Sequence, residues 1–416
     1  MRRLLMPLGL AAALLSPLAS AQDAAPVRPD PAPEPPGALT LDVALALATA
    51  QNPTLSAARH ELDAAEGGIT QARVIPNPEV ALLMEDTRQS TRTTTAQMNL
   101  PVELGGKRAA RIGAAQRTRE LAQAQLGNTQ ADLRASVIGA FFNVLVAQER
   151  VRLAAGSTEI AARGARAAAR RVAAGKISPV EETKAGVELA NAELERAEAD
   201  AALIAARQAL STLWGNPSPR FAEADGNLEA LPTRPEAVLL RQSLDASPAL
   251  VASQRELARR QAEINVQRSR QYPDVTLSVG AKRENASDRG YYPVLGVAIP
   301  LPLFDRNQGN LYTAIRQADK AADEYRATQV RLDHDLQQAA SQLAVSRASA
   351  LTLRETVLPA AQRAYQAATQ GFEAGKFNYL DVLDAQRTLL QARIRYLGVV
   401  ASSWQAATTI DRILGR

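Results

Sequence analysis

The sequence contains a stretch of helix-forming residues that is far longer than the diameter of a small domain. No proline occurs between Pro101 and Pro179, and residues 104–174 are rich in Ala, Leu, Gln, Arg and Glu. At 1.5 Å per residue, one helix of this length would extend roughly 105 Å. Only other helices alongside it could bury its apolar positions. The run therefore predicts long helices packed side by side, as in a coiled coil.

A second long run, residues 308–373, has the same character. It carries one proline, Pro359, which should bend a helix at that point. Aromatic residues make up only 4% of the 416 residues, so few large side chains could fill a thick globular core. We therefore expect a mainly α fold with a small β part.

The chain repeats itself at an interval of about 200 residues, which is too long for a solenoid unit and indicates internal duplication. The matching positions are prolines and glycines at the ends of predicted elements. They are Pro53 and Pro248, Pro78 and Pro273, Leu100-Pro101 and Leu301-Pro302, Ala174-Gly175-Lys176 and Ala374-Gly375-Lys376, and Gly215 and Gly415.

Both halves have the same order of predicted elements. The first repeat, 41–215, contains a short helix, strands at about 79–86 and 94–101, and a helical hairpin at 104–214. The second repeat, 236–416, contains a short helix, strands at about 274–283 and 292–301, and a helical hairpin at 308–414. A Pro-containing linker or equatorial segment, 216–235, separates them. The two shorter helices of each half would have to stack nearly end to end to cover the long one.

Each hairpin turn combines a helix stop with a helix start. Gly175 and Gly375 can adopt the left-handed conformation that ends a helix. The residues Ser178 to Glu181 form a capping-box pattern, and Asn378 to Asp381 are the second copy of it. Capping alone would account for Asp381. It does not account for Asp384, which lies one turn further along on the same face.

The strand segments alternate apolar and polar residues, a pattern that fits any half-buried hairpin. Their length and their polar connections also fit strands that cross an outer membrane. Four strands cannot close such a barrel, because the smallest have about eight. Two, three or four copies of the chain would give about 8, 12 or 16 strands.

The N-terminal residues 1–21 have the features of a secretory signal peptide. Two arginines precede an apolar run, and Ala19-Ser20-Ala21 is a small-x-small cleavage site. The Pro-rich residues 22–40 should form an extended, poorly ordered spacer. The chain has no cysteine, so disulfides, thiolate metal sites and a lipid-modified N-terminal cysteine are excluded.

Few residues suggest catalysis or ligand chemistry. The formal charge of +5 is spread along the chain, without a basic block that would favour nucleic acid. The two histidines, His60 and His334, lie far apart on charged helical stretches, so no metal site is expected. Gly105-Gly106-Lys107 lacks the spacing of a phosphate loop. We expect neither an enzyme nor a bound cofactor.

At several points the sequence resembles the TolC-like outer-membrane efflux ducts. The duplicated half, the two Gly-containing helix reversals and "YLDVLDAQRTLLQARIRY" at 379–396 carry the resemblance. "LPVELGGKR" at 100–108 and "IPLPLFDRNQGN" at 299–310 resemble the subgroup that serves cobalt, zinc and cadmium efflux. The resemblance covers nearly all of the mature chain.

The resemblance implies a homotrimer in the outer membrane of a Gram-negative bacterium. Its twelve-stranded β-barrel would continue as an α-helical barrel across the periplasm and receive metal cations from an RND-type inner-membrane pump through a periplasmic adaptor. By the same resemblance, Gly175, Lys176, Gly375 and Lys376 are candidates for adaptor docking. Asp381 and Asp384 correspond to the acidic constriction of the family. Because clustered carboxylates attract cations, this placement is physically reasonable.

Two alternatives remain open at this stage. The same duct could carry drugs or other organic compounds. The chain could also be a periplasmic coiled-coil structural or adaptor-like protein, in which the strands form a soluble hairpin domain.

Overall fold

The computed structural model describes residues 34–86, 88–285, 290–374 and 376–416. The predicted signal peptide, 1–21, and residues 22–33 of the predicted spacer lie outside this range. In the first half the elements are β1 (Ala38–Thr40), α1 (Leu41–Gln51), α2 (Pro53–Arg73), β2 (Glu79–Glu85), β3 (Thr93–Val102), α3 (Lys107–Ala173), α4 (Pro179–Thr212) and β4 (Glu223–Asp225).

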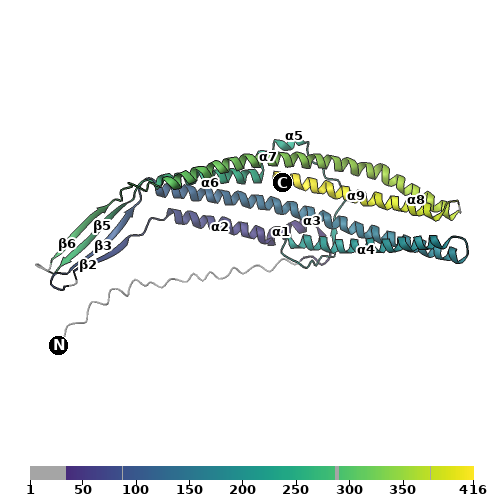
Figure 1. The fold of residues 1–416 in the computed structure, drawn as a ribbon, viewed down its shortest axis with the longest axis horizontal. Helices are drawn as coiled ribbons and strands as arrows, with labels where there is room; N and C mark the ends of the chain where they lie inside the picture. Colours follow the sequence, from purple (N-terminus) through teal and green to yellow (C-terminus); the bar gives the residue numbers. More distant parts are fainter. Residues whose placement is uncertain (1–33, 87, 286–289, 375) are drawn as a thin grey trace, which may run out of the picture. The chain divides into compact units, whose positions relative to one another are not determined.

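The second half repeats the order from α1 to α4, and its described residues include no counterpart of β1 or β4. Its elements are α5 (Ala237–Arg241), a short 3-10 helix (Leu244–Ala246), α6 (Pro248–Ser269), β5 (Val275–Glu284), β6 (Tyr291–Ala298), α7 (Gln308–Thr352), a π-helical turn (Leu353–Val357), α8 (Leu358–Glu373) and α9 (Tyr379–Leu414). The strands β2, β3, β5 and β6 lie at one end of the long helices, and the hairpin turns lie at the other (Figure 1). In the part of the chain that the structure describes, no helix is both long and apolar enough to span a membrane.

The long helix α3 organises the first half. It runs for 67 residues without a break, which corresponds to about 100 Å. It packs against α2 and α4 of its own half and against α6 and α9 of the other half. The predicted side-by-side packing of long helices is confirmed.

The shorter helices stack end to end along the long ones, as the repeat predicts. Asn52 links α4 to α2, because its side-chain amide donates to the Leu213 carbonyl at 2.7 Å while its Oδ1 accepts from the Leu55 N–H. At the matching joint of the second half, Gly415 closely approaches Pro248, at the start of α6. Both glycines at these joints, Gly215 and Gly415, have positive φ angles, so the backbone turns sharply there.

The second long helix differs from the expectation at Pro359. The sequence predicts a bend at the proline, whereas the irregularity lies just before it, as the π-helical turn Leu353–Val357. Proline has no N–H for the carbonyl four residues earlier, and a π turn accommodates such a local mismatch while the chain stays helical. Residues 308–373 therefore remain one continuous helical arm.

The end of the predicted spacer is ordered, which corrects the expectation for residues 34–40. The carboxylate of Glu34 is buried and accepts hydrogen bonds from Trp214 Nε1 at 2.5 Å and from Asn216 Nδ2 at 2.7 Å. It also accepts from the backbone N–H of Arg220. The strand β1 then pairs in parallel with β4, inside the predicted linker. These bonds fix the segment despite its prolines.

Two apolar clusters form the core. The first lies where α1, α3 and α4 meet the β1–β4 pair, and its aromatic residues include Phe141, Phe142 and Trp214. The ring of Phe142 stacks on Trp404 of α9 with centroids 3.5 Å apart, which ties the two halves together. The second cluster joins α6, α7 and α9 around Leu336 and Ile410.

Candidate functional site

The four-stranded sheet joins strands from both repeats in the order β2-β3-β5-β6, all antiparallel. The central pair, β3 and β5, links the repeats over ten residue pairs. β6 ends at Ala298, three residues before the predicted end at 301. Pro300 and Pro302 explain this, because neither has an N–H to extend the ladder.

One face of the sheet is apolar across all four strands. The register places Val80 opposite Met98, Met98 opposite Val279, and Val279 opposite Leu295. These four side chains remain 72%, 45%, 52% and 81% exposed. A neighbouring row contains Leu100, Leu277 and Val297. An exposed apolar face of this extent indicates contact with lipid or protein.

The other face of the sheet is mainly polar, although Leu83 and Tyr292 also lie on it. Asn99 lies opposite Ser278, whose hydroxyl donates to the Asn99 Oδ1 at 2.7 Å. Gln97 donates to the same oxygen at 3.2 Å. Further along, Lys282 forms an ion pair with Glu284 at 2.8 Å. Such a sheet, apolar on one side and polar on the other, has the composition of a membrane barrel wall around an aqueous lumen.

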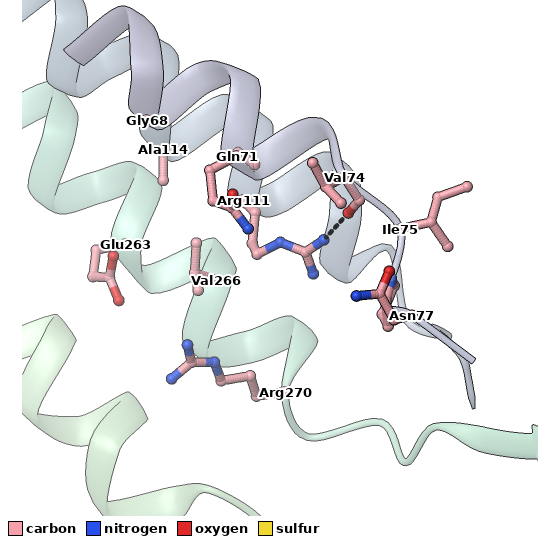
Figure 2. Close-up of a pocket in the computed structure, with 12 residues that line it drawn as sticks. Gly68, Gln71, Val74, Ile75, Asn77, Arg111, Ala114, Glu263, Val266 and Arg270 are labelled. Carbon is pink, nitrogen blue, oxygen red and sulfur yellow. Dashed lines mark hydrogen bonds between the residues drawn. The ribbon is translucent and has the colours of Figure 1, made fainter. Parts of the chain in front are cut away.

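Ion pairs fasten the sheet to the helices. Lys107, at the start of α3, contacts Asp274 at 2.7 Å, and Arg111 forms an ion pair with Glu103. The hydrogen bond to Glu103 raises the pKa of the Arg111 guanidinium above its usual value, so the guanidinium stays charged. Arg111 also donates to the Val74 carbonyl at 3.2 Å, as Figure 2 shows.

A cavity of about 590 Å³ lies beside Arg111, between α2, α3 and α6 (Figure 2). Glu263 of α6 and Arg270, the C-cap residue of this helix, contribute charged groups to its lining. Among the described residues, no three His, Cys, Asp or Glu side chains lie close enough together to hold a metal ion.

The first hairpin turn has a defined geometry. Gly175 has a φ of 66°, and its N–H donates to the Val172 carbonyl while the N–H of Lys176 donates to the Arg171 carbonyl. These two bonds form a Schellman motif that ends α3. Space around the Gly175 α-carbon is open and Lys176 is exposed. The turn therefore presents backbone and a positive charge to the outside.

The second turn follows the same plan. The N–H of Lys376 donates to the Gly371 carbonyl at 2.8 Å, which repeats the bond from Lys176 to Arg171. Lys376 is exposed. Gly375, the remaining residue predicted for this turn, lies outside the described residues.

The two acidic residues predicted for the constriction have different surroundings. Asp381 forms a capping box with Asn378, because each side chain accepts from the backbone N–H of the other at 3.0 Å. Asp384 is exposed and makes no hydrogen bond or ion pair with any residue that the structure describes. Capping thus explains the first carboxylate but not the second.

Contacts between the two hairpin ends were not predicted. The guanidinium of Arg171 lies 4.0 Å from the centre of the Phe372 ring. Behind it, Ala168, Ala185 and Leu383 form a small buried cluster. The sequence pattern offers no signal for this pairing, because the contacting residues lie about 200 positions apart and occupy non-equivalent sites in the repeats.

A groove of about 360 Å³ runs along α3, α4 and α9 near these ends. Glu188, Glu195 and Glu198 of α4 contribute to its lining. Arg387 of α9 donates to the carboxylate of Glu188 at 3.1 Å, which bridges the groove. The groove is therefore mainly acidic on its α4 side.

Comparison with known sequences identifies relatives of the whole chain. The profile of the family described as "Outer membrane efflux protein" matches residues 44–216 and 239–416. The chain is 66% identical to the cobalt-zinc-cadmium resistance protein CzcC of Cupriavidus metallidurans over 100% of both chains. It is 29% identical to the nickel-cobalt-cadmium resistance protein NccC of Alcaligenes xylosoxydans xylosoxydans, over 76% of this chain and 71% of that protein.

Solved structures show the same fold. The outer membrane protein VceC of Vibrio cholerae superposes with a TM-score of 0.74 at 20% identity, over 90% of this chain and 96% of VceC. The open state of the MtrE outer membrane channel of Neisseria gonorrhoeae superposes with a TM-score of 0.75 at 18% identity, over 90% and 88% of the two chains. The expected fold, duplicated α-hairpins joined to a small sheet, is confirmed.

Proposed function

The chain belongs to the outer membrane efflux protein family, and from this membership we propose that it is the passive duct through which a tripartite, proton-driven system exports heavy-metal cations. The observation that carries the proposal is the sheet. Its apolar face, its polar face and its direct junction with the long helices fit a wall that passes from membrane to periplasm. A soluble hairpin domain would leave the apolar face exposed to water.

We propose that three copies close the barrel. The outer edges of β2 and β6 have no neighbouring strand among the described residues. Open edges of this kind pair with another chain unless they are blocked. Three copies supply about twelve strands, within the range known for outer-membrane barrels.

The proposed cargo rests on the relatives. CzcC and NccC are named for resistance to cobalt, cadmium and either zinc or nickel. The chain covers the full length of CzcC at 66% identity, which supports a similar cargo. The described residues offer no cluster of metal ligands, so the choice of metal would lie with the inner-membrane pump and the adaptor.

The hairpin ends would form the periplasmic entrance. Gly175, Lys176 and Lys376, together with Gly375, would meet the adaptor. Asp381 and Asp384 would line the constriction, where three copies bring six carboxylates near one axis. Carboxylates at this density attract cations and oppose the passage of anions.

Deletion of the gene tests the cargo. In cells preloaded with zinc, cobalt or cadmium, we expect the deletion to slow metal efflux and lower resistance without changing initial uptake. The full chain supplied in trans should restore both properties. Unchanged efflux, in a strain without a second duct, would contradict the metal assignment.

Drug and dye resistance, measured in the same strains, distinguishes an organic cargo from a metal cargo. Loss of drug resistance with intact metal resistance would favour the organic-compound duct. A freely soluble monomer after fractionation would eliminate both kinds of duct and favour a periplasmic structural protein.

A further inference from the structure

Every junction between a strand and a helix of the sheet domain carries an exposed, large apolar side chain. Ile75 precedes β2, Leu104 follows β3, Tyr272 precedes β5, and Leu303 and Phe304 follow β6. Their exposed fractions are 62%, 43%, 58%, 65% and 91%, respectively. All five lie in the connections at the helix end of the sheet, and we call this set the belt.

The belt continues the apolar face of the sheet. On β6 the exposed apolar residues recur at every second position as Leu295 and Val297, and Ile299, Leu301 and Leu303 continue the same spacing beyond the last paired residue. On the neighbouring pair of strands, the N–H of Leu104 donates to Asp274, which fixes the belt residue to the sheet.

The strand β6 is shorter than its neighbours, with eight residues against ten in β3 and in β5. The apolar part of β6, from Pro293 to Ala298, spans about 20 Å along the strand, or about 15 Å across a bilayer at the usual tilt. Outer-membrane barrels have an apolar band about 25 Å tall. The residues after β6 would supply the rest of the band at this edge of the sheet.

Two prolines reduce the number of backbone donors in residues 299–304. Pro300 and Pro302 have no N–H, and the N–H of Leu303 donates to the Leu301 carbonyl at 2.8 Å. Unsatisfied backbone donors are costly in lipid, so each proline lowers the cost of placing this segment there. Below the segment, Asn307 donates to the carbonyl of Gln267 at 2.8 Å, which anchors the chain to α6.

Comparison of the two repeats shows that an exposed aromatic residue in this loop is specific to the second repeat. Phe304 occupies the position of Glu103, as the alignment of Leu301-Pro302 with Leu100-Pro101 places it. Glu103 is turned inward to its ion pair with Arg111, whereas Phe304 is almost fully exposed. The two copies of one loop thus have opposite polarity.

We propose that the segment Ile299–Phe304 inserts into the inner leaflet of the outer membrane and, with Ile75, Leu104 and Tyr272, sets the depth of the duct. The proposal rests on the placement of the sheet in the membrane, and its partner is the acyl region of phospholipid near the headgroups. Apolar and aromatic side chains at this level anchor a protein at the bilayer interface.

Tryptophan substitution tests the proposal in the full chain reconstituted in phospholipid vesicles. The native Trp214 and Trp404 lie in the helical region, so an added tryptophan reports its own site. Phe304→Trp should lose most of its added fluorescence in lipid brominated close to the headgroup. Leu295→Trp, in the middle of β6, should be quenched more than Phe304→Trp by lipid brominated deeper in the acyl chains. Val330→Trp, far along α7, should be quenched by neither lipid.

The other outcomes distinguish failure of the inserted segment from failure of the membrane sheet. If Phe304→Trp behaves like Val330→Trp while Leu295→Trp is quenched, the inserted segment is refuted and the membrane sheet stands. Quenching of the Phe304→Trp variant by aqueous acrylamide would then place the segment in water, and resistance to both quenchers would place it under a second copy of the chain. Absence of quenching at Leu295→Trp would refute the membrane sheet itself. Leu303→Trp provides a second probe if the Phe304→Trp variant fails to assemble.

Discussion

Asp381 and Asp384 lie one turn apart on α9, yet only one of them has a structural task. Asp381 accepts from the N–H of Asn378 and completes a capping box. Asp384 is exposed and has no such bond among the described residues. A neutral substitution at each position can therefore separate helix capping from an effect on passing ions.

We expect Asp384→Asn to reduce cation preference in planar bilayers without changing stability, because it removes charge and no hydrogen bond. We expect Asp381→Asn to reduce cation preference and also to lower the free energy of unfolding. The loss should be about 0.5–1 kcal/mol, because the helix cap is weakened. Reversal potentials under a salt gradient measure selectivity, and thermal unfolding measures stability. Equal reversal potentials in wild type and both variants would leave capping as the only role of these residues.

The helix α6 contains a cluster of ion pairs whose contribution to folding stability depends on pH. The hydrogen bond from Arg259 to Glu256, with a second from Arg260, lowers the pKa of the Glu256 carboxyl below its ordinary value of 4.5. A carboxyl with a lowered pKa in the folded state stabilises the protein above its unfolded pKa. This contribution is lost as the pH falls through the lower, folded value.

We therefore expect the unfolding free energy of wild type to fall more steeply below about pH 4.5 than that of Glu256→Gln. Denaturant unfolding at a series of pH values measures the difference. Asp323→Asn is a suitable control, because the ion pair of Asp323 with Arg326 is 76% exposed on both sides and contributes little. Identical slopes for wild type and Glu256→Gln would contradict the assignment.

The helices α4 and α9 meet across the groove through Glu188 and Arg387. The Glu188 side chain is mostly buried, which makes a like charge opposite it unfavourable. We expect Arg387→Glu to separate the two hairpin ends and raise single-channel conductance. The charge swap, Glu188→Arg with Arg387→Glu, should return the conductance toward wild type. A swap that conducts like the single variant would show that the pair does not hold the ends together.

The sequence predicts these elements well where a local signal exists. Prolines at equivalent positions, such as Pro53 and Pro248, mark helix starts in both repeats, and Asn378 with Asp381 forms the expected capping box. Contacts between distant residues carry no such signal. Glu34 binds Trp214 although it lies in a Pro-rich segment, and Glu188 meets Arg387 without any matching pattern.

The duplication also predicts the contacts between copies of the chain. Within one chain, α3 of the first repeat packs against α6 of the second. In a closed ring, the same packing would recur between copies. There α7 of one copy, the equivalent of α3, would pack against α2 of the next copy, the equivalent of α6. The contacts inside the chain therefore predict the contacts between chains, position by position.

One such contact can be tested directly. A Cβ at Gly105 would lie 2.6 Å from the Cβ of Tyr272. The repeat alignment places Arg306 at the position of Gly105 and Asn77 at that of Tyr272. Arg306 of one copy should thus lie beside Asn77 of the next, although β6 and β2 are opposite edges of the sheet in one chain.

Because the chain has no cysteine, the double variant Asn77→Cys and Arg306→Cys carries only the two thiols of interest. Mild oxidation should link three chains into a ring that reductant reverses on a denaturing gel, since a disulfide requires Cβ atoms about 3.5–4.5 Å apart. Each single variant should stay unlinked, and so should Asn77→Cys combined with Val330→Cys, whose thiols lie too far apart. A trimer by native mass spectrometry that forms no such bond would mean that the copies meet in another register. The equivalence between contacts inside the chain and contacts between chains would then be wrong.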